Sequence, residues 1–205
     1  MYGKGHGIKA KTQDTGHQFY MAHLEPGTPI RGYFIQQRIG EGAAGVAYEA
    51  LTRDNKPVVL KCVPLKKRWF KAEYLREVTA LRQCNGSEVV VKMIDYFAHG
   101  SLGVLVLEKL DMDLIDYLEE EDCMSLQEAK IVFKQVCLAI KALHDKKIAH
   151  LDIKPDNIFM NDIDDVRLGD LGSCFQWSEE NTHKRNHIYQ PQQTSGALEF
   201  CYTYL

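Results

Sequence analysis

Apolar residues in the first half of the chain occur in short runs rich in β-branched and aromatic side chains, and this pattern predicts strands. Between the third and fourth runs, residues 67–83 place Tyr74, Val78 and Leu81 on one face of a helix. The runs are residues 33–40, 45–51, 57–63, 89–97 and 102–110. The first half is therefore expected to form a β-rich unit in which one helix interrupts the strands.

The apolar spacing becomes helical after the last of these runs. Residues 112–121 are expected to form a short helix. Ser125 and Glu128 have the spacing of a capping box, and they precede a long helix expected from about Leu126 to His144. Short strands are expected at residues 157–160 and 166–170.

Two polar regions lie outside these elements. Residues 1–30 are rich in Gly, Lys, Thr and Gln and are expected to form a flexible extension. Residues 178–195 are rich in Asn, Gln and His, which favours a mobile loop.

The overall composition is that of a globular protein and excludes several classes. The chain has 205 residues, a net charge of −3 and 45% hydrophobic residues, so a strongly basic nucleic-acid-binding surface is not expected. The six cysteines form no CxxC pair, which favours reduced thiols in a cytoplasmic or nuclear protein. No apolar stretch approaches the roughly 18 residues of a membrane span, and the N-terminus lacks the apolar core of a signal peptide.

A glycine-rich segment stands between two of the predicted strands. Gly40, Gly42 and Gly45 have GxGxxG spacing, which alone is weak evidence for phosphate binding. A strand rather than a helix follows them, so a hairpin is expected whose backbone N–H groups could cover a polyphosphate. A tight hairpin turn without a ligand is the alternative.

Lys61 lies inside the apolar segment VVLKCV. A lysine there must extend its ammonium to water or pair with an anion. Glu77, on the predicted helix 67–83, is a candidate partner. A lysine on the solvent-facing side of the strand is the simpler alternative.

Two polar segments in the second half could carry chemistry. Asp152, Lys154 and Asn157 lie within six residues of one another around Pro155, which excludes a helix. A carboxylate can accept a hydroxyl proton, a lysine can neutralise phosphate charge, and an asparagine carbonyl can bind magnesium. On spacing alone a polar turn is slightly favoured. Asp170, in the segment DLG at the end of a predicted strand, suits either a metal ligand or a turn.

In this order, the motifs resemble the motif series of eukaryotic protein kinases over about residues 33–200. The motifs are the glycine hairpin, the strand lysine, the helix glutamate, and the segments HLDIKPDN and DLG. The resemblance implies an α+β, two-lobe fold with a β-rich N-lobe that has one helix and an incomplete, mostly helical C-lobe. Residues 31–110 would form the N-lobe and hinge. Residues 111–205 would form a partial C-lobe with the catalytic loop and activation segment. HLDIKP, NIF and GDLG also resemble the Wee/Myt branch, which the activation segment does not follow.

The resemblance implies ATP and Mg²⁺ as cofactors and a role for each motif residue. Asp152 would orient and deprotonate the acceptor hydroxyl, with Lys154 near the transferring phosphate. Asn157 and Asp170 would bind magnesium. The residues implied in ATP binding belong to the glycine loop, the ion pair, the gatekeeper and hinge, and a ribose contact: Ile39, Gly40, Gly42, Gly45, Ala47, Val59, Lys61, Glu77, Leu107, Glu108, Leu110 and Asp113. Lys154 resembles serine/threonine rather than tyrosine kinases.

The chain also departs from the family pattern. Ala47 stands where valine is usual and Val59 where alanine is usual, so the adenine pocket is expected to keep its volume. Leu151 replaces the arginine that usually pairs with a phosphate, so phosphorylation of the candidates Thr182, Thr194 or Ser195 is expected to matter little by that route. The final segment SGALEFCYTYL resembles the stretch just before the family's Ala-Pro-Glu motif. Either residues 202–204 replace that motif or the chain stops just before it, and both alternatives imply an incomplete C-lobe.

Two functional hypotheses follow. The first is an ATP- and magnesium-dependent kinase of protein serine or threonine residues, whose activity depends on the missing part. The second is a catalytically silent kinase-like module that binds ATP, or docks a partner on the apolar helix face near residues 126–144. A nucleotide-binding fold unrelated to kinases would instead prefer a dinucleotide. Neither nucleic acid nor a membrane is an expected partner.

Overall fold

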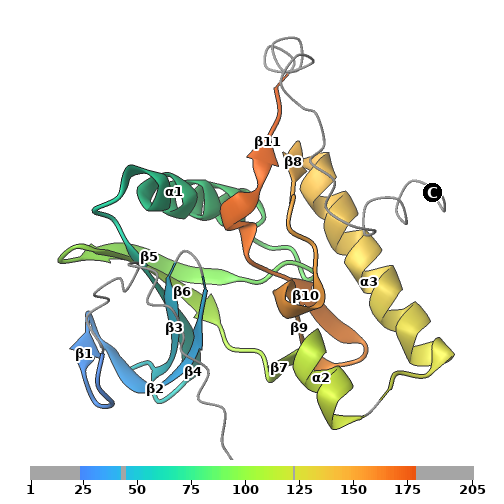
Figure 1. Cartoon of the computed structure of the whole chain (residues 1–205), viewed down its shortest axis with the longest axis horizontal. Helices are drawn as coiled ribbons and strands as arrows, with labels where there is room; N and C mark the ends of the chain where they lie inside the picture. The colour runs from blue at the N-terminus through green and yellow to red at the C-terminus, as the bar shows by residue number, and fades with distance from the viewer. Residues whose placement is uncertain (1–23, 43–44, 122, 179–205) are drawn as a thin grey trace, which may run out of the picture.

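The computed structural model describes residues 24–42, 45–121 and 123–178 (Figure 1). Several expectations fall outside these residues: most of the N-terminal extension, nearly all of the polar loop, the C-terminal segment, and the phosphorylation candidates Thr182, Thr194 and Ser195.

The first half forms a six-stranded antiparallel sheet in the order β1-β2-β3-β4-β6-β5. Alternate residues of β3 and β4 point into a closed apolar core, as the period of a strand requires. The sheet curls so far that Tyr33 on β2 stacks on Phe97 of β5, with ring centroids 6.1 Å apart. The strands are β1 (Pro29–Ile30), β2 (Tyr33–Glu41), β3 (Val46–Leu51), β4 (Pro57–Pro64), β5 (Met93–His99) and β6 (Leu102–Glu108).

One long helix, α1 (Arg68–Gln83), packs against this sheet. Its buried residues recur at helical spacing and include Phe70, Tyr74, Val78 and Leu81. The Tyr74 hydroxyl donates to the backbone oxygen of Phe97 at 3.2 Å, which ties the helix to β5.

The described part of the second half contains two helices and two small sheets (Figure 1). Both helices begin with a capping box, Asp113 with Asp116 and Ser125 with Glu128. The elements are β7 (Met112–Asp113), α2 (Leu114–Glu120), α3 (Leu126–Asp145), β8 (Ile148–Ala149), η1 (Pro155–Asn157), β9 (Ile158–Asp162), β10 (Asp165–Leu168), η2 (Leu171–Ser173) and β11 (Phe175–Gln176). One sheet has the order β10-β9-β7, and the other pairs β11 with β8.

A second apolar core extends from α1 to α3 and joins the two halves. Leu81 of α1 and Leu171 of η2 both belong to it, and Met93 packs against it. The two-lobe arrangement expected from the motif series is therefore confirmed.

Several expected element boundaries were wrong. The strands expected to end at residues 110 and 170 end at Glu108 and Leu168, and the strand expected at 157–160 is Ile158–Asp162. Three further differences have a clear physical cause. Residues 29 and 30 are part of the sheet rather than of a flexible extension, because β1 pairs with β2 and Ile30 is fully buried. The apolar run 89–97 contains a strand only from Met93 onward, because Val89–Val91 instead bonds to Leu168 on β10. Met112 and Asp113 form β7, so the short helix begins two residues later than expected.

Candidate functional site

Three charged groups from distant parts of the sequence meet between the lobes. The Lys61 ammonium on β4 lies 2.9 Å from Glu77 Oε1 and 2.8 Å from Oε2, and 2.7 Å from Asp170 Oδ1. Glu77 is only 2% exposed, so its charge depends on this lysine. The predicted strand-to-helix pair is formed, and Asp170 joins it.

These neighbours set the charge of each group. Burial alone would lower the pKa of Lys61, but the carboxylates of Glu77 and Asp170 outweigh it and raise that pKa. Burial raises the pKa of Glu77, against the opposing effect of Lys61. Burial also acts to raise the pKa of Asp170, but the charge and hydrogen bond of Lys61 outweigh it, so that pKa is lowered. Lys61 therefore keeps its positive charge at neutral pH.

The glycine-rich hairpin joins β2 to β3. The Gly42 N–H donates to the Gly45 carbonyl at 2.9 Å, which closes the turn. At Gly45 an added Cβ would lie 2.3 Å from the backbone oxygen of Cys62, so the sheet itself requires glycine there. At Gly40 and Gly42 an added Cβ would meet no atom of the described residues within 4 Å. The space beside these two glycines is open, as a ligand covered by the hairpin would require.

Hydrogen bonds shape the loop that carries the second polar segment. His150 is buried; its Nε2 lies 2.8 Å from the Gly169 carbonyl, and its Nδ1 accepts from the Asp152 N–H at 3.2 Å. The Asn157 amide donates to the backbone oxygen of Asp152 at 2.7 Å and to its Oδ2 at 3.1 Å. Lys154 Nζ lies 3.3 Å from the same Oδ2. Asp152, Lys154 and Asn157 thus form one cluster rather than a simple polar turn.

Asp170 has a special backbone conformation. Its φ of 54° is in the left-handed region, and its side chain accepts from the Gly172 N–H at 3.4 Å. Arg76, an exposed residue of α1, donates to the Gly172 carbonyl at 2.6 Å. The segment after β10 is therefore held against α1, the helix that carries Glu77.

The residues expected around an adenine lie on adjacent strands and on the connection that follows them. Ala47 pairs with Lys61 across β3 and β4, and Val59 pairs with Leu107 across β4 and β6. Ile39, on β2, is 45% exposed.

The expected hinge, residues 108–110, begins at the last residue of β6. Leu110 is 8% exposed, and its backbone N–H makes no hydrogen bond within the described residues. Glu108 pairs with Arg167 of β10 at 3.1 Å. Asp113, expected at the ribose, caps α2 by accepting from the Asp116 N–H at 2.9 Å.

Sequence reasoning missed Arg76 and Arg167. Both lie on regular elements at positions that face away from the apolar core. An arginine at such a position has the pattern of an ordinary surface residue, so nothing in the sequence indicates its partner.

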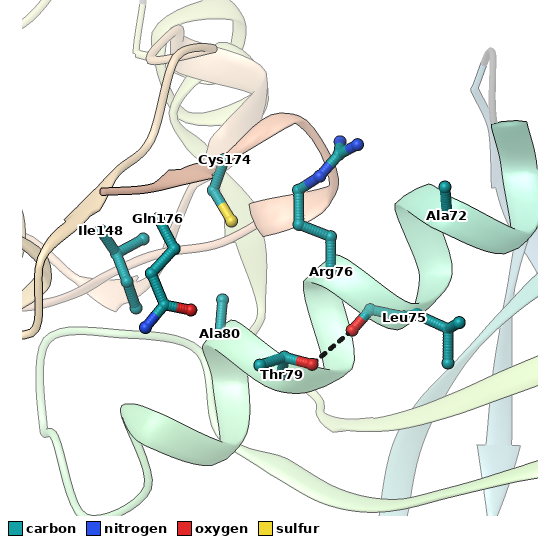
Figure 2. Close-up of a pocket in the computed structure, with 8 residues that line it drawn as sticks. All are labelled: Ala72, Leu75, Arg76, Thr79, Ala80, Ile148, Cys174 and Gln176. Atoms are coloured by element: carbon teal, nitrogen blue, oxygen red, sulfur yellow. Dashed lines mark hydrogen bonds between the residues drawn. The ribbon is translucent and has the colours of Figure 1, made fainter. Parts of the chain in front are cut away.

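A separate shallow groove of about 390 Å³ runs between α1 and the β8–β11 pair (Figure 2). None of the predicted site residues lines it. Its lining residues are Ala72, Leu75, Arg76, Thr79, Ala80, Ile148, Cys174 and Gln176.

Comparison with known proteins agrees with this geometry. The protein kinase domain family matches residues 33–200. The chain is 31% identical over 185 residues to the carbon catabolite-derepressing protein kinase of Saccharomyces cerevisiae, covering 85% of this chain and 29% of that protein. It is 30% identical to cyclin-dependent kinase 12 of Caenorhabditis elegans, covering 81% of this chain and 25% of that protein. It is 29% identical to the serine/threonine-protein kinase dst1 of Dictyostelium discoideum, covering 77% of this chain and 22% of that protein.

The chain thus spans less than a third of the length of these curated relatives. Within the described residues, no helix is long and apolar enough to cross a membrane.

Proposed function

Because the chain belongs to the protein kinase family, we propose that it transfers the γ-phosphoryl group of ATP to a serine or threonine hydroxyl of a protein substrate. The observation that carries this proposal is the position of Lys61, whose ammonium contacts both Glu77 and Asp170. One cation there would face the phosphates while its carboxylate partners fix its position. The cytoplasmic or nuclear location expected from the cysteines is part of the same proposal.

Two oxygen atoms of the site suit magnesium, which prefers oxygen ligands. Asn157 donates through Nδ2 to Asp152, and its Oδ1 makes no hydrogen bond within the described residues. Asp170 uses Oδ1 for Lys61 and the Gly172 N–H, whereas its Oδ2 makes no hydrogen bond in the described part of the chain. A bound magnesium ion would neutralise negative charge on the phosphate oxygens.

The catalytic loop would then act on the acceptor. Asp152 would orient the hydroxyl and take its proton as the oxygen bonds to the γ-phosphorus and ADP leaves. Lys154, beside that carboxylate, would offset the charge on the transferred group. Asn157 holds the Asp152 side chain in place through its amide.

Transfer of labelled phosphate from γ-labelled ATP to a serine/threonine peptide library tests this proposal. Asp152→Asn should lower turnover by about 10²–10⁴-fold, the usual contribution of a general base, and leave magnesium-ATP affinity unchanged. The matched control is Asp145→Asn, since the Asp145 side chain at the end of α3 is 62% exposed and pairs with Lys141 rather than with a residue of the site. Full turnover in Asp152→Asn, or a parent chain that binds no magnesium-ATP, would contradict the proposal.

The second candidate is a catalytically silent module that binds ATP or docks a partner. It is favoured by the apolar side chains that α3 exposes in the described part of the chain: Leu126 is 74% exposed, Phe133 55% and Leu138 45%. A parent chain that binds magnesium-ATP without any phosphate transfer would support this candidate over the first.

A further inference from the structure

Side chains of the β9–β10 hairpin hold both ends of the hinge between β6 and β7. At the first end, Arg167 Nε lies 3.1 Å from Glu108 Oε1. At the second end, the Asp111 N–H donates to Asn161 Oδ1 at 3.2 Å. Both Arg167 and Asn161 belong to the C-lobe hairpin, so the hinge backbone is attached to that lobe twice.

The two attachments are connected to each other. Arg167 Nη1 also contacts Asp165 Oδ1, and Asp165 Oδ2 accepts from the Asn161 amide nitrogen at 2.7 Å. A continuous chain of polar contacts therefore runs from Glu108 through Arg167, Asp165 and Asn161 to the Asp111 N–H. We call these five residues the hinge relay.

One end of the relay, the Glu108–Arg167 pair, is more enclosed than ordinary surface ion pairs, whereas the Asp165 side chain is 40% exposed. The Arg167 side chain is 19% exposed and the Glu108 side chain 25%. Glu108 Oε1 also accepts from the Lys92 N–H at 2.7 Å, and the Glu108 N–H donates to the Lys92 carbonyl at 3.0 Å. Loss of Arg167 would leave two half-enclosed carboxylates, Glu108 and Asp165, without their cation.

The backbone between the two ends of the relay leaves a donor unpaired within the described residues, although the Leu110 carbonyl accepts from Lys109 Nζ at 2.9 Å. Between its ends, the Leu110 N–H makes no hydrogen bond within the described residues. A backbone N–H that donates to a planar base must have one orientation. Because the Leu110 N–H has no partner in the described part of the chain, the residues that hold the two ends of the hinge set that orientation.

We propose that Arg167 is a positioning residue of the nucleotide site: acting through the hinge relay, it fixes the hinge backbone at which the base of ATP binds. The proposal deepens the proposed function and rests on it for the identity of the ligand. Adenine contacts are the same before and during phosphoryl transfer, so their loss raises KM for ATP and leaves kcat unchanged.

The first test needs no nucleotide. Amide hydrogen exchange of the full ligand-free chain is followed by NMR in the parent, Arg167→Met, the conservative Arg167→Lys and Asn161→Leu. Exchange at Asp111 should rise roughly tenfold in Arg167→Met, which does not touch that amide directly, and less in Arg167→Lys. Amides of β3 and β4 serve as internal reference, because a general loss of stability would raise their exchange equally. The control is Lys141→Met, which breaks only the exposed pair with Asp145.

The second test measures the nucleotide. Arg167→Met and Asn161→Leu should each raise KM for ATP roughly tenfold with kcat unchanged, and Lys141→Met should change neither. Unchanged exchange at Asp111 in Arg167→Met overturns the proposal whether or not the chain is an enzyme. A fall in kcat at unchanged KM also overturns it. If exchange at Asp111 rises but the parent binds no ATP, the relay is established and the proposed function is what fails.

Discussion

The two lobes position their functional groups by different means. In the N-lobe, Lys61 and Glu77 lie on a regular strand and a regular helix, and packing fixes both. In the C-lobe, Asp152 and Asp170 lie on irregular backbone. Leu151, next to Asp152, has a φ of 67°, and Asp170 has a φ of 54°.

The two lobes therefore differ in which feature of the site costs free energy of folding. The N-lobe buries a charged pair, which is stable only while both partners are present. At its candidate site the C-lobe holds Leu151 and Asp170 in left-handed conformations, which cost about 1–3 kcal/mol each where surrounding bonds impose them. Each substitution below tests one side of this contrast.

The largest effect is expected at the buried pair. Lys61→Met leaves the Glu77 carboxylate buried without a cation and should lower the free energy of unfolding by about 3 kcal/mol or more. Chemical denaturation of the parent and variant measures this. Lys141→Met, which breaks an exposed pair, should change it by less than about 0.5 kcal/mol. Equal effects of the two substitutions would refute the contrast for the N-lobe.

The glycine hairpin provides the next test. Gly45→Ala puts a methyl group against the Cys62 carbonyl and should lower the free energy of unfolding by about 1–3 kcal/mol. Gly40→Ala, whose Cβ meets open space, should change it by less than about 1 kcal/mol. Its effect should instead appear as weaker magnesium-ATP binding in a titration. If Gly45→Ala is as stable as Gly40→Ala, the close approach does not constrain the sheet.

A smaller effect of opposite sign is expected in the C-lobe. Leu151 is 54% exposed and left-handed, so its side chain contributes little packing and its backbone is strained. Leu151→Asn should raise the free energy of unfolding by about 0.5–1 kcal/mol, because asparagine tolerates the left-handed region. Leu151→Val, which tolerates it poorly, should lower stability. The same change in both variants would show that the side chain, and not the backbone, matters.

The smallest effect is expected from His150, whose protonation should lower the stability of the folded chain in acid. Burial lowers the pKa of His150, and its Nδ1 already accepts the Asp152 N–H, so the folded chain favours neutral imidazole. The unfolded chain therefore binds the proton better than the folded chain. The contribution of His150 to the free energy of unfolding is fully present above a pH of about 6.5, and it is lost as the pH falls through the lower pKa of the folded chain. Denaturation at several pH values should show a weaker acid dependence in His150→Gln. An identical pH dependence of the two proteins would mean that other groups dominate.

Helices α1 and α3 and strands β3 and β4 could be predicted because each has one apolar face with a clear period, and β6 because its apolar run is continuous. The long helix expected from about residues 126 to 144 is Leu126–Asp145 in the structure. The same pattern wrongly predicted that residues 89–91 belong to a strand of the N-lobe sheet. An apolar run looks the same in the sequence whether it joins that sheet or bonds to the other lobe. β1 is too short for any period to reveal.

The candidate site was predicted from the order of its motifs, and the structure brings Lys61, Glu77 and Asp170 together. The roles of these residues, and the Wee/Myt resemblance, stay predictions. The hinge relay was beyond prediction, because Arg167 and Asn161 lie on short strands as polar residues whose partners depend on the way β9 and β10 meet the hinge. Partner choice across such distances is a tertiary property that local spacing does not contain.

The bonds of Val89 and Val91 to Leu168 have a mechanical consequence. The Leu168 N–H donates to the Val89 carbonyl at 3.0 Å, and the Val91 N–H donates to the Leu168 carbonyl at 3.0 Å, beside the covalent hinge. Backbone bonds in both directions at one residue resist sliding of one lobe past the other beside the hinge. The Arg76–Gly172 bond and the shared apolar core attach the lobes at further places, so the lobes are held together well beyond the covalent connection.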